Sequence, residues 1–155
     1  MNVTTTAMVT RLMLPALLRH AASTGRRAAL LNVGSIVGRF HWPGTQLYGA
    51  CKAFIDHLTV PLAHEHRDQL DVLSFQPTVM ATAMAAGTEP AAITIAPGQA
   101  ARAALSHLGH VRSSHGHWRH ALLAALLLAT PPARRNALLL SSALQMEAVE
   151  RAKGA

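Results

Sequence analysis

Tyr48 and Lys52 have the residue types and the spacing that best fit a chemical role. Tyr48 is the only tyrosine of the 155-residue sequence, and Lys52 is one of two lysines. A separation of four residues places both side chains on one face of a helix. An ammonium group near a phenol favours the phenolate, so a tyrosine with such a neighbour can act as a general acid or base near neutral pH.

Ser35 lies 13 residues before Tyr48, directly after a short apolar run at residues 28–33 that predicts a buried strand. Open α/β sheets bind their ligands beyond the carboxyl ends of their strands, which is where Ser35 would lie. A Tyr–Lys pair or a Gly–Ser turn is common by itself. The combination, with the intervening turn and the following strand, favours a catalytic site.

Helices and strands alternate around these three residues. Hydrophobic spacing predicts a helix over residues 3–20, the strand at 28–33, a helix over 45–67 in which Pro61 should cause a kink, and a strand over 71–75 that ends at Pro77. This order is typical of a parallel sheet, so we expect an α/β layer architecture for residues 1–80. Further along, we expect a long irregular loop at 81–97, helices at 99–108 and 118–129, and a last amphipathic helix that ends at Lys153.

Composition excludes several classes of protein. Half of the residues are apolar and 14% are charged, which is too hydrophobic for intrinsic disorder, and the abundance of alanine and leucine disfavours an all-β fold. The single cysteine, Cys51, excludes an internal disulfide and fits a reducing compartment. No amino-terminal secretion signal is visible.

Positive charge is concentrated from residue 91 onward, where seven Lys/Arg stand against two Asp/Glu. Because Trp118 is the only Phe, Trp or Tyr among these arginines, a membrane surface is favoured over nucleic acid as the partner. The apolar run at 121–129 is too short to span a bilayer but is bracketed by arginines. We therefore expect residues 117–144 to be membrane-proximal; the alternative is a pair of ordinary packing helices.

Five histidines fall within 14 residues and suggest a zinc site: His107, His110, His115, His117 and His120. Neither a cysteine nor a carboxylate accompanies them, and they straddle a predicted turn. We therefore expect a polar, partly exposed connector and no metal.

The segment NVGSIVG at residues 32–38, followed by Tyr48-x-x-x-Lys52, resembles the short-chain dehydrogenase/reductases, specifically their carboxyl-terminal half. Asn2, Pro77 and Thr82 also match family positions, although Thr78 replaces the usual glycine after the proline. The resemblance implies an α/β fold: a partial Rossmann-like, doubly wound parallel sheet that lacks its amino-terminal dinucleotide-binding half. It implies a boundary between this half-domain, residues 1–97, and a helical extension, residues 98–155.

Residue by residue, the resemblance implies catalytic roles for Asn2, Ser35, Tyr48 and Lys52. Tyr48 would be the general acid, Ser35 would hold the substrate carbonyl, and Asn2 would position a water relay. Lys52 would favour the tyrosinate and, with Tyr48, bind the nicotinamide ribose. Pro77 and Thr82 would complete the cofactor contacts, Thr82 at the nicotinamide carboxamide.

Five further motifs resemble the branch of very-long-chain 3-oxoacyl-CoA reductases and 17β-hydroxysteroid dehydrogenases: Leu14-Pro15, His64-Glu65, Ala81-Thr82-x-Met84, Ala104-Leu105-Ser106 and Gly116-x-x-x-His120-Ala121-Leu122. This branch implies NADP(H)-dependent reduction of a lipid-like ketone, an acyl-CoA or a steroid. It also implies a location at the endoplasmic reticulum membrane and a homodimer formed through the Tyr48/Lys52 helix.

The sequence contains no glycine-rich turn of the G-x-G-x-x-G type, which would cradle the pyrophosphate of the cofactor. We therefore expect a truncated form of a longer reductase. Two alternatives remain open: a non-catalytic remnant that keeps only the helices used for dimer packing, and a peripheral membrane module built on residues 117–153.

Overall fold

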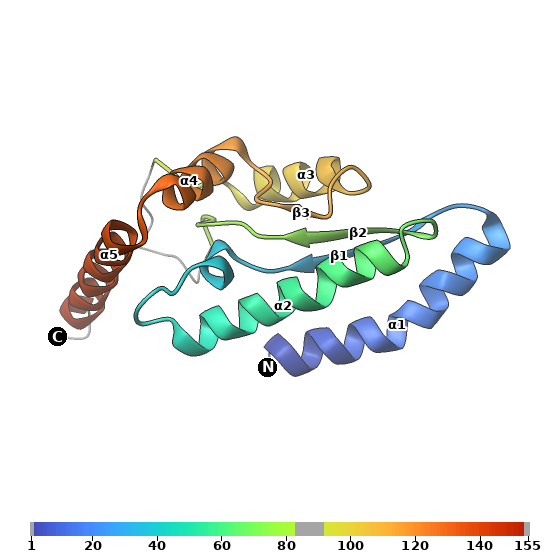
Figure 1. The fold of residues 1–155 in the computed structure, drawn as a ribbon, viewed down its shortest axis with the longest axis horizontal. Helices are drawn as coiled ribbons and strands as arrows, with labels where there is room; N and C mark the ends of the chain where they lie inside the picture. Colours follow the sequence, from blue (N-terminus) through green and yellow to red (C-terminus); the bar gives the residue numbers. More distant parts are fainter. Residues whose placement is uncertain (1, 83–91, 154–155) are drawn as a thin grey trace.

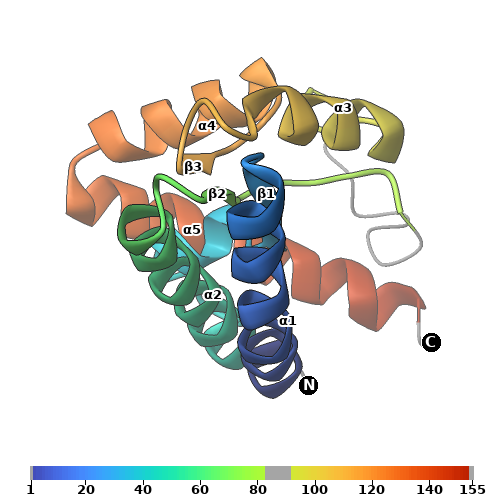
Figure 2. The ribbon, with the colours of Figure 1, turned by 90° about the vertical axis from the view of Figure 1, so that its right-hand side faces the viewer.

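The fold is a small parallel sheet between two layers of helices (Figures 1 and 2). The computed structural model describes residues 2–82 and 92–153. The elements, in chain order, are α1 (Asn2–Thr24), β1 (Ala28–Val33), the 3-10 helix η1 (Ile36–Arg39), α2 (Gln46–Glu65), β2 (Leu70–Phe75), α3 (Pro97–His107), β3 (Ser113–Ser114), α4 (Trp118–Ala129) and α5 (Pro132–Lys153).

The sheet has the strand order β1-β2-β3, and both pairings are parallel. β1 and β2 pair along their whole length, from Ala28 opposite Leu70 to Val33 opposite Phe75. α1 and α2 lie on one face of the sheet, and α3 and α4 lie on the other (Figure 2). The expected α/β architecture with a partial, doubly wound parallel sheet is confirmed.

β2 is the central strand, helices cover both of its faces, and four of its six residues are apolar: Leu70, Val72, Leu73 and Phe75. Leu70 and Val72 pack with Ala63 of α2 and with leucines of α1. On the other face, Leu73 and Phe75 pack with α3 and with Ile95. The alternation of side chains along one strand therefore builds both halves of the core.

The predicted strand at 28–33 is confirmed, and the other early elements differ from expectation by a few residues. α1 continues to Thr24, beyond the expected end at residue 20, and α2 ends at Glu65. Pro15 and Pro61 both lie inside helices that continue past them. Neighbouring turns and packing evidently compensate for the missing amide donors.

The expectation of a histidine-rich turn followed only by helices is wrong at residues 113–114, which form β3. Two residues are too short to show a periodicity, so the strand is defined by its hydrogen bonds to β2. Ser74 N–H donates to Arg112 O at 2.9 Å, and Gln76 N–H donates to Ser114 O at 2.7 Å. The carboxyl-terminal part of the chain thus contributes a strand to the sheet.

Residues 81–97 are predicted to form an irregular loop, and the second end of this segment packs into the fold. Ile95 is buried and forms a parallel bridge with Met80. α3 starts at Pro97, two residues before the expected helix. Residues 83–91, and Met84 of the branch motif with them, lie outside the described residues.

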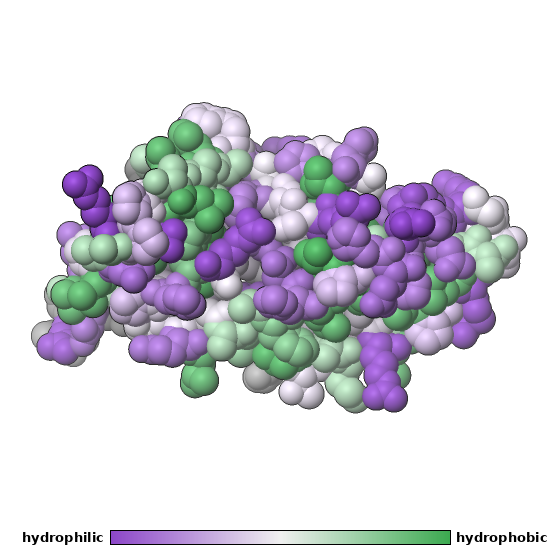
Figure 3. Space-filling model, in the orientation of Figure 1, coloured by the Kyte–Doolittle hydropathy of each residue, from purple (hydrophilic) through white to green (hydrophobic). Residues whose placement is uncertain are grey.

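α4 and α5 pack against the turn that follows β1. Leu127 and Leu139 share a buried cluster with Ile36 and Phe40 of that turn, and Trp42 Nε1 donates to Ser142 Oγ at 3.1 Å. α4 exposes Leu122, Leu126 and Leu128. Figure 3 shows an apolar area over α4. Within the part of the chain that the structure describes, no helix is both long and apolar enough to cross a bilayer.

Candidate active site

The turn that carries Ser35 is fixed by backbone hydrogen bonds to the end of β2. Gly34 N–H donates to Phe75 O at 2.7 Å, and Ile36 N–H donates to Pro77 O at 3.0 Å. Ser35 is buried and caps η1, because its Oγ accepts from Val37 N–H at 3.3 Å. The hydroxyl hydrogen of Ser35 is left available to donate.

A row of polar side chains sets the position of α2 along the sheet. Asn32 Nδ2 of β1 donates to Thr59 Oγ1 at 2.9 Å, and Ser74 Oγ of β2 donates to Asp56 Oδ1 at 2.7 Å. Lys52, Asp56 and Thr59 follow one another at helical spacing, so one face of α2 carries all three contacts. With two contacts fixing the helix, Lys52 is held beside the carboxyl end of β1.

Gly38 permits the close approach of η1 to α2. A Cβ atom at this position would lie 2.6 Å from Ala53 N and 2.7 Å from Lys52 C. These are backbone atoms and cannot move aside cheaply, so only glycine fits. The last glycine of the NVGSIVG segment therefore brings the Ser35 turn against the helix that carries Lys52.

Lys52 Nζ donates to Val33 O at 3.0 Å and lies 5.5 Å from the centroid of the Tyr48 ring. The tyrosine side chain is 39% exposed at the start of α2. Burial lowers the pKa of the Lys52 ammonium from its usual value of 10.5, and the neighbouring Cys51 opposes this shift. The sequence-based prediction that Tyr48 and Lys52 share a helix face is borne out by this geometry.

The structure gives fewer contacts for the other predicted site residues, which are Pro77, Thr82 and Asn2. Pro77 is buried beside the Ser35 turn through its bond to Ile36 N–H. Thr82 is exposed on the segment after β2. Asn2 is the first residue of α1, and its side chain lies outside the described part of the chain. The structure therefore groups Ser35, Tyr48, Lys52 and Pro77 at the carboxyl edge of β1 and β2.

His120 is buried, contrary to the expectation of a partly exposed histidine connector. Thr78 N–H donates to its Nδ1 at 3.3 Å, and its Nε2–H donates to Ile93 O at 3.0 Å. α4 thus holds both the segment that follows β2 and the segment before α3. Burial lowers the pKa of His120 and outweighs the opposing hydrogen bonds to backbone carbonyls.

His115 and Gln76 extend the polar contacts around β2 and were not identified as functional in the sequence. His115 Nδ1–H donates to Gln76 O at 2.8 Å, and Gln76 Nε2 donates to the Asp56 carboxylate. Burial lowers the pKa of His115, assisted by the charge of Arg39. Among the described residues, no cluster of three or more potential metal ligands is present.

The family model for short chain dehydrogenases matches residues 1–92. The very-long-chain 3-oxoacyl-CoA reductase of Anas platyrhynchos is 28% identical over 148 residues, which are 95% of this chain and 46% of that protein. The inactive hydroxysteroid dehydrogenase-like protein 1 of Danio rerio is 31% identical over 84% of this chain and 40% of that protein. The chain therefore spans less than half the length of these two relatives.

Among solved structures, a short chain dehydrogenase from Burkholderia cenocepacia in complex with NADP is 27% identical, with a TM-score of 0.73. The similarity covers 90% of this chain and 57% of that one. The matched residues of the family model include Ser35, Tyr48, Lys52 and Pro77. The chain belongs to the short-chain dehydrogenase family.

Proposed function

We propose that this chain is the catalytic, carboxyl-terminal half of an NADP(H)-dependent reductase that converts a ketone into a hydroxyl group. The observation that carries the proposal is the Tyr48–Lys52 pair beside Ser35 at the carboxyl edge of the sheet, with Lys52 Nζ bound to Val33 O. Ligands of open α/β sheets bind at this edge.

In this proposal, Tyr48 delivers a proton from its hydroxyl to the oxygen of the ketone. The Ser35 hydroxyl donates a hydrogen bond to the same oxygen, since its own Oγ is oriented by Val37 N–H. The ammonium of Lys52, near the Tyr48 ring, stabilises the tyrosinate that remains. The nicotinamide cofactor supplies the hydride.

The residues present fit the nicotinamide-ribose end of this cofactor. A lysine ammonium has three donors, and only one Lys52 donor is used by Val33 O, so two N–H groups can bind ribose hydroxyls. Thr82 would contact the carboxamide, and Asn2 would position a water relay. The pyrophosphate needs a glycine-rich turn that these 155 residues lack, so we propose that an amino-terminal half supplies it.

We propose a lipid-like substrate, a 3-oxoacyl-CoA or a steroid ketone, and a location at the endoplasmic reticulum membrane. The name of the duck relative supports the acyl-CoA, whereas the steroid rests only on the likeness to a hydroxysteroid dehydrogenase-like protein that is itself named inactive. Exposed Leu122, Leu126 and Leu128 on α4 support contact with a membrane surface.

A homodimer through α2 is also part of this proposal. Leu47 and Phe54 on α2, and Met8, Val9 and Leu12 on α1, leave apolar side chains exposed on the layer formed by these two helices. A second copy would cover this surface.

The test joins the chain to the amino-terminal half of the duck reductase relative and follows NADPH oxidation at 340 nm with a 3-oxoacyl-CoA and with a steroid ketone. Tyr48→Phe should lower kcat by several orders of magnitude, because the proton donor is removed, and Lys52→Ala nearly as much. His57→Gln, on an exposed part of the same helix, is the control. A Tyr48→Phe chimaera within tenfold of the parent would contradict the catalytic role, and an inactive parent chimaera that folds would favour the non-catalytic alternative.

A further inference from the structure

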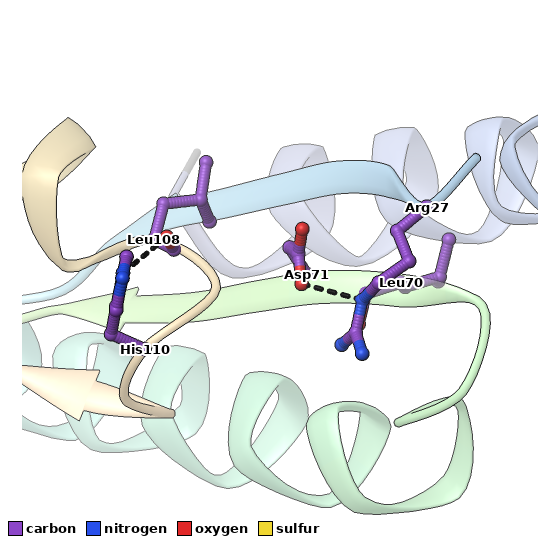
Figure 4. Close-up of polar contacts among 5 residues, drawn as sticks. All are labelled: Arg27, Leu70, Asp71, Leu108 and His110. Carbon is purple, nitrogen blue, oxygen red and sulfur yellow. Dashed lines mark hydrogen bonds and ion pairs between the residues drawn. The ribbon is translucent and has the colours of Figure 1, made fainter.

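A polar cavity of about 240 Å³ lies at the edge of the sheet where the strands begin, opposite the edge that carries Ser35. Figure 4 shows Arg27, Asp71 and His110 at this edge. The lining residues are Arg27, Ala63, Arg67, Leu70, Asp71, Val72, Gly109, His110, Val111 and Arg112.

Each of the three strands is preceded by an arginine that lines this cavity. Arg27 comes directly before β1, Arg67 three residues before β2, and Arg112 directly before β3. Because parallel strands begin at the same edge, arginines from three separate turns line one space. His110, from the loop between α3 and β3, also lines the cavity, and its Nδ1–H donates to Leu108 O at 3.2 Å.

Aspartate provides little compensation for this positive charge. Asp71 is the only acidic residue of the lining, so three arginines face one carboxylate. Arg27 Nε contacts Asp71 Oδ1 at 2.7 Å, and Arg27 Nη2 donates to Leu70 O at 2.8 Å. Arg67 is 3.8 Å from the neighbouring Asp68, but both side chains are largely exposed, so this pair contributes little.

We propose that this cavity binds a phosphate group. Guanidinium groups match phosphate oxygens in geometry and charge, and Arg67 and Arg112 line the space from two different turns. The group would belong to a soluble phosphate ester or to a phospholipid headgroup. The site is independent of the proposed reductase activity, because it lies at the opposite end of the strands.

Helix ends offer a competing explanation for the arginines. α1, α2 and α3 all end at this edge, at Thr24, Glu65 and His107. The partial negative charge at helix carboxyl ends stabilises nearby cations without any ligand. If this were their whole role, replacing an arginine would lower the stability of the protein, while added phosphate would have no specific effect.

Thermal unfolding of the full 155-residue chain with inorganic phosphate separates the two explanations, with chloride added to hold ionic strength constant. We expect a saturable rise in Tm with a dissociation constant on the order of 1 mM. Arg67→Gln and Arg112→Gln should each weaken binding about tenfold, because each removes a charged donor. Asp71→Asn should strengthen binding, because it removes the competing carboxylate and releases Arg27.

Arg102→Gln is the matched control, since Arg102 is an exposed arginine of α3 outside the cavity lining. Binding of glycerol 3-phosphate and of vesicles containing phosphatidic acid is then measured to distinguish a soluble ester from a lipid headgroup. The physiological class of ligand is the one whose binding is weakened by Arg112→Gln. The proposal is overturned if phosphate acts no differently from chloride, if Arg102→Gln weakens binding as much as Arg112→Gln, or if Asp71→Asn weakens it.

Discussion

Replacing His120 by phenylalanine tests the role of the one fully buried histidine. Phenylalanine keeps the ring volume but removes the acceptor for Thr78 N–H and the donor for Ile93 O. An orphaned buried polar group costs about 1–3 kcal/mol, so two backbone groups that are only partly shielded should cost about 2–4 kcal/mol together. At roughly 2–4 °C per kcal/mol for a chain of this size, Tm should fall by about 4–16 °C.

The pH dependence gives a second readout for the same variant. Burial lowers the pKa of folded His120 below its unfolded value of ~6.5, so the unfolded chain binds more protons on acidification. The stability that neutral His120 contributes is complete above about pH 6.5 and is lost as the pH falls through the lowered pKa of the folded protein. His120→Phe should therefore lose less stability than the parent between pH 7 and pH 5, although His115 keeps part of the dependence.

Urea unfolding followed by circular dichroism at a series of pH values measures both effects. His57→Phe, an exposed histidine on α2, is the control and should leave stability within about 0.5 kcal/mol of the parent. A cost below 1 kcal/mol for His120→Phe, or an unchanged acid profile, would refute the bridging role assigned to this ring.

Three further predictions follow from the site and the surface. Gly38→Ala should destabilise the chain by about 2–4 kcal/mol in urea unfolding, because the new Cβ would meet Ala53 N and Lys52 C, whereas Gly98→Ala, whose Cβ would make only an ordinary contact with Arg102 Nη1 at 3.7 Å, should not. NADPH titrated into the 155-residue chain alone should bind with millimolar affinity or weaker, on the order of 4 kcal/mol, by fluorescence; micromolar binding would contradict the need for an amino-terminal half. Anionic liposomes should retain the parent chain, and replacing Leu126 and Leu128 by serine should release it; equal partitioning of both proteins would mean that α4 does not bind lipid.

The sequence was informative where chemistry or periodicity is local. The strand at 28–33 and the helix-face relation of Tyr48 and Lys52 depend on runs and spacings that a single segment carries. The Lys52–Val33 contact could be anticipated only in outline, because it depends on the register of α2, which Asn32 and Asp56 set through long-range bonds.

Other features left no local signal. β3 has two residues and exists through its bonds to β2, and His120 reads as a polar residue until α4 is packed over the sheet. The motif Gly116-x-x-x-His120 marked the position, but spacing alone cannot tell a buried bridge from an exposed ring. The three arginines before the strands look scattered in sequence, because only the parallel pairing brings their turns to one edge.

β1 is an outer strand of the described sheet, so its free edge can affect how the purified chain associates. Its outer side presents a row of backbone N–H and C=O groups with no strand beside them among the described residues, which is a template for pairing with a second polypeptide. The strand AALLNV carries no charge and no proline to discourage such pairing. During purification, aggregation should therefore begin at this strand. Ala29→Lys, at an exposed position of β1, should raise the highest concentration at which the chain stays monodisperse. Ala101→Lys, at an exposed position of α3, should leave this concentration unchanged.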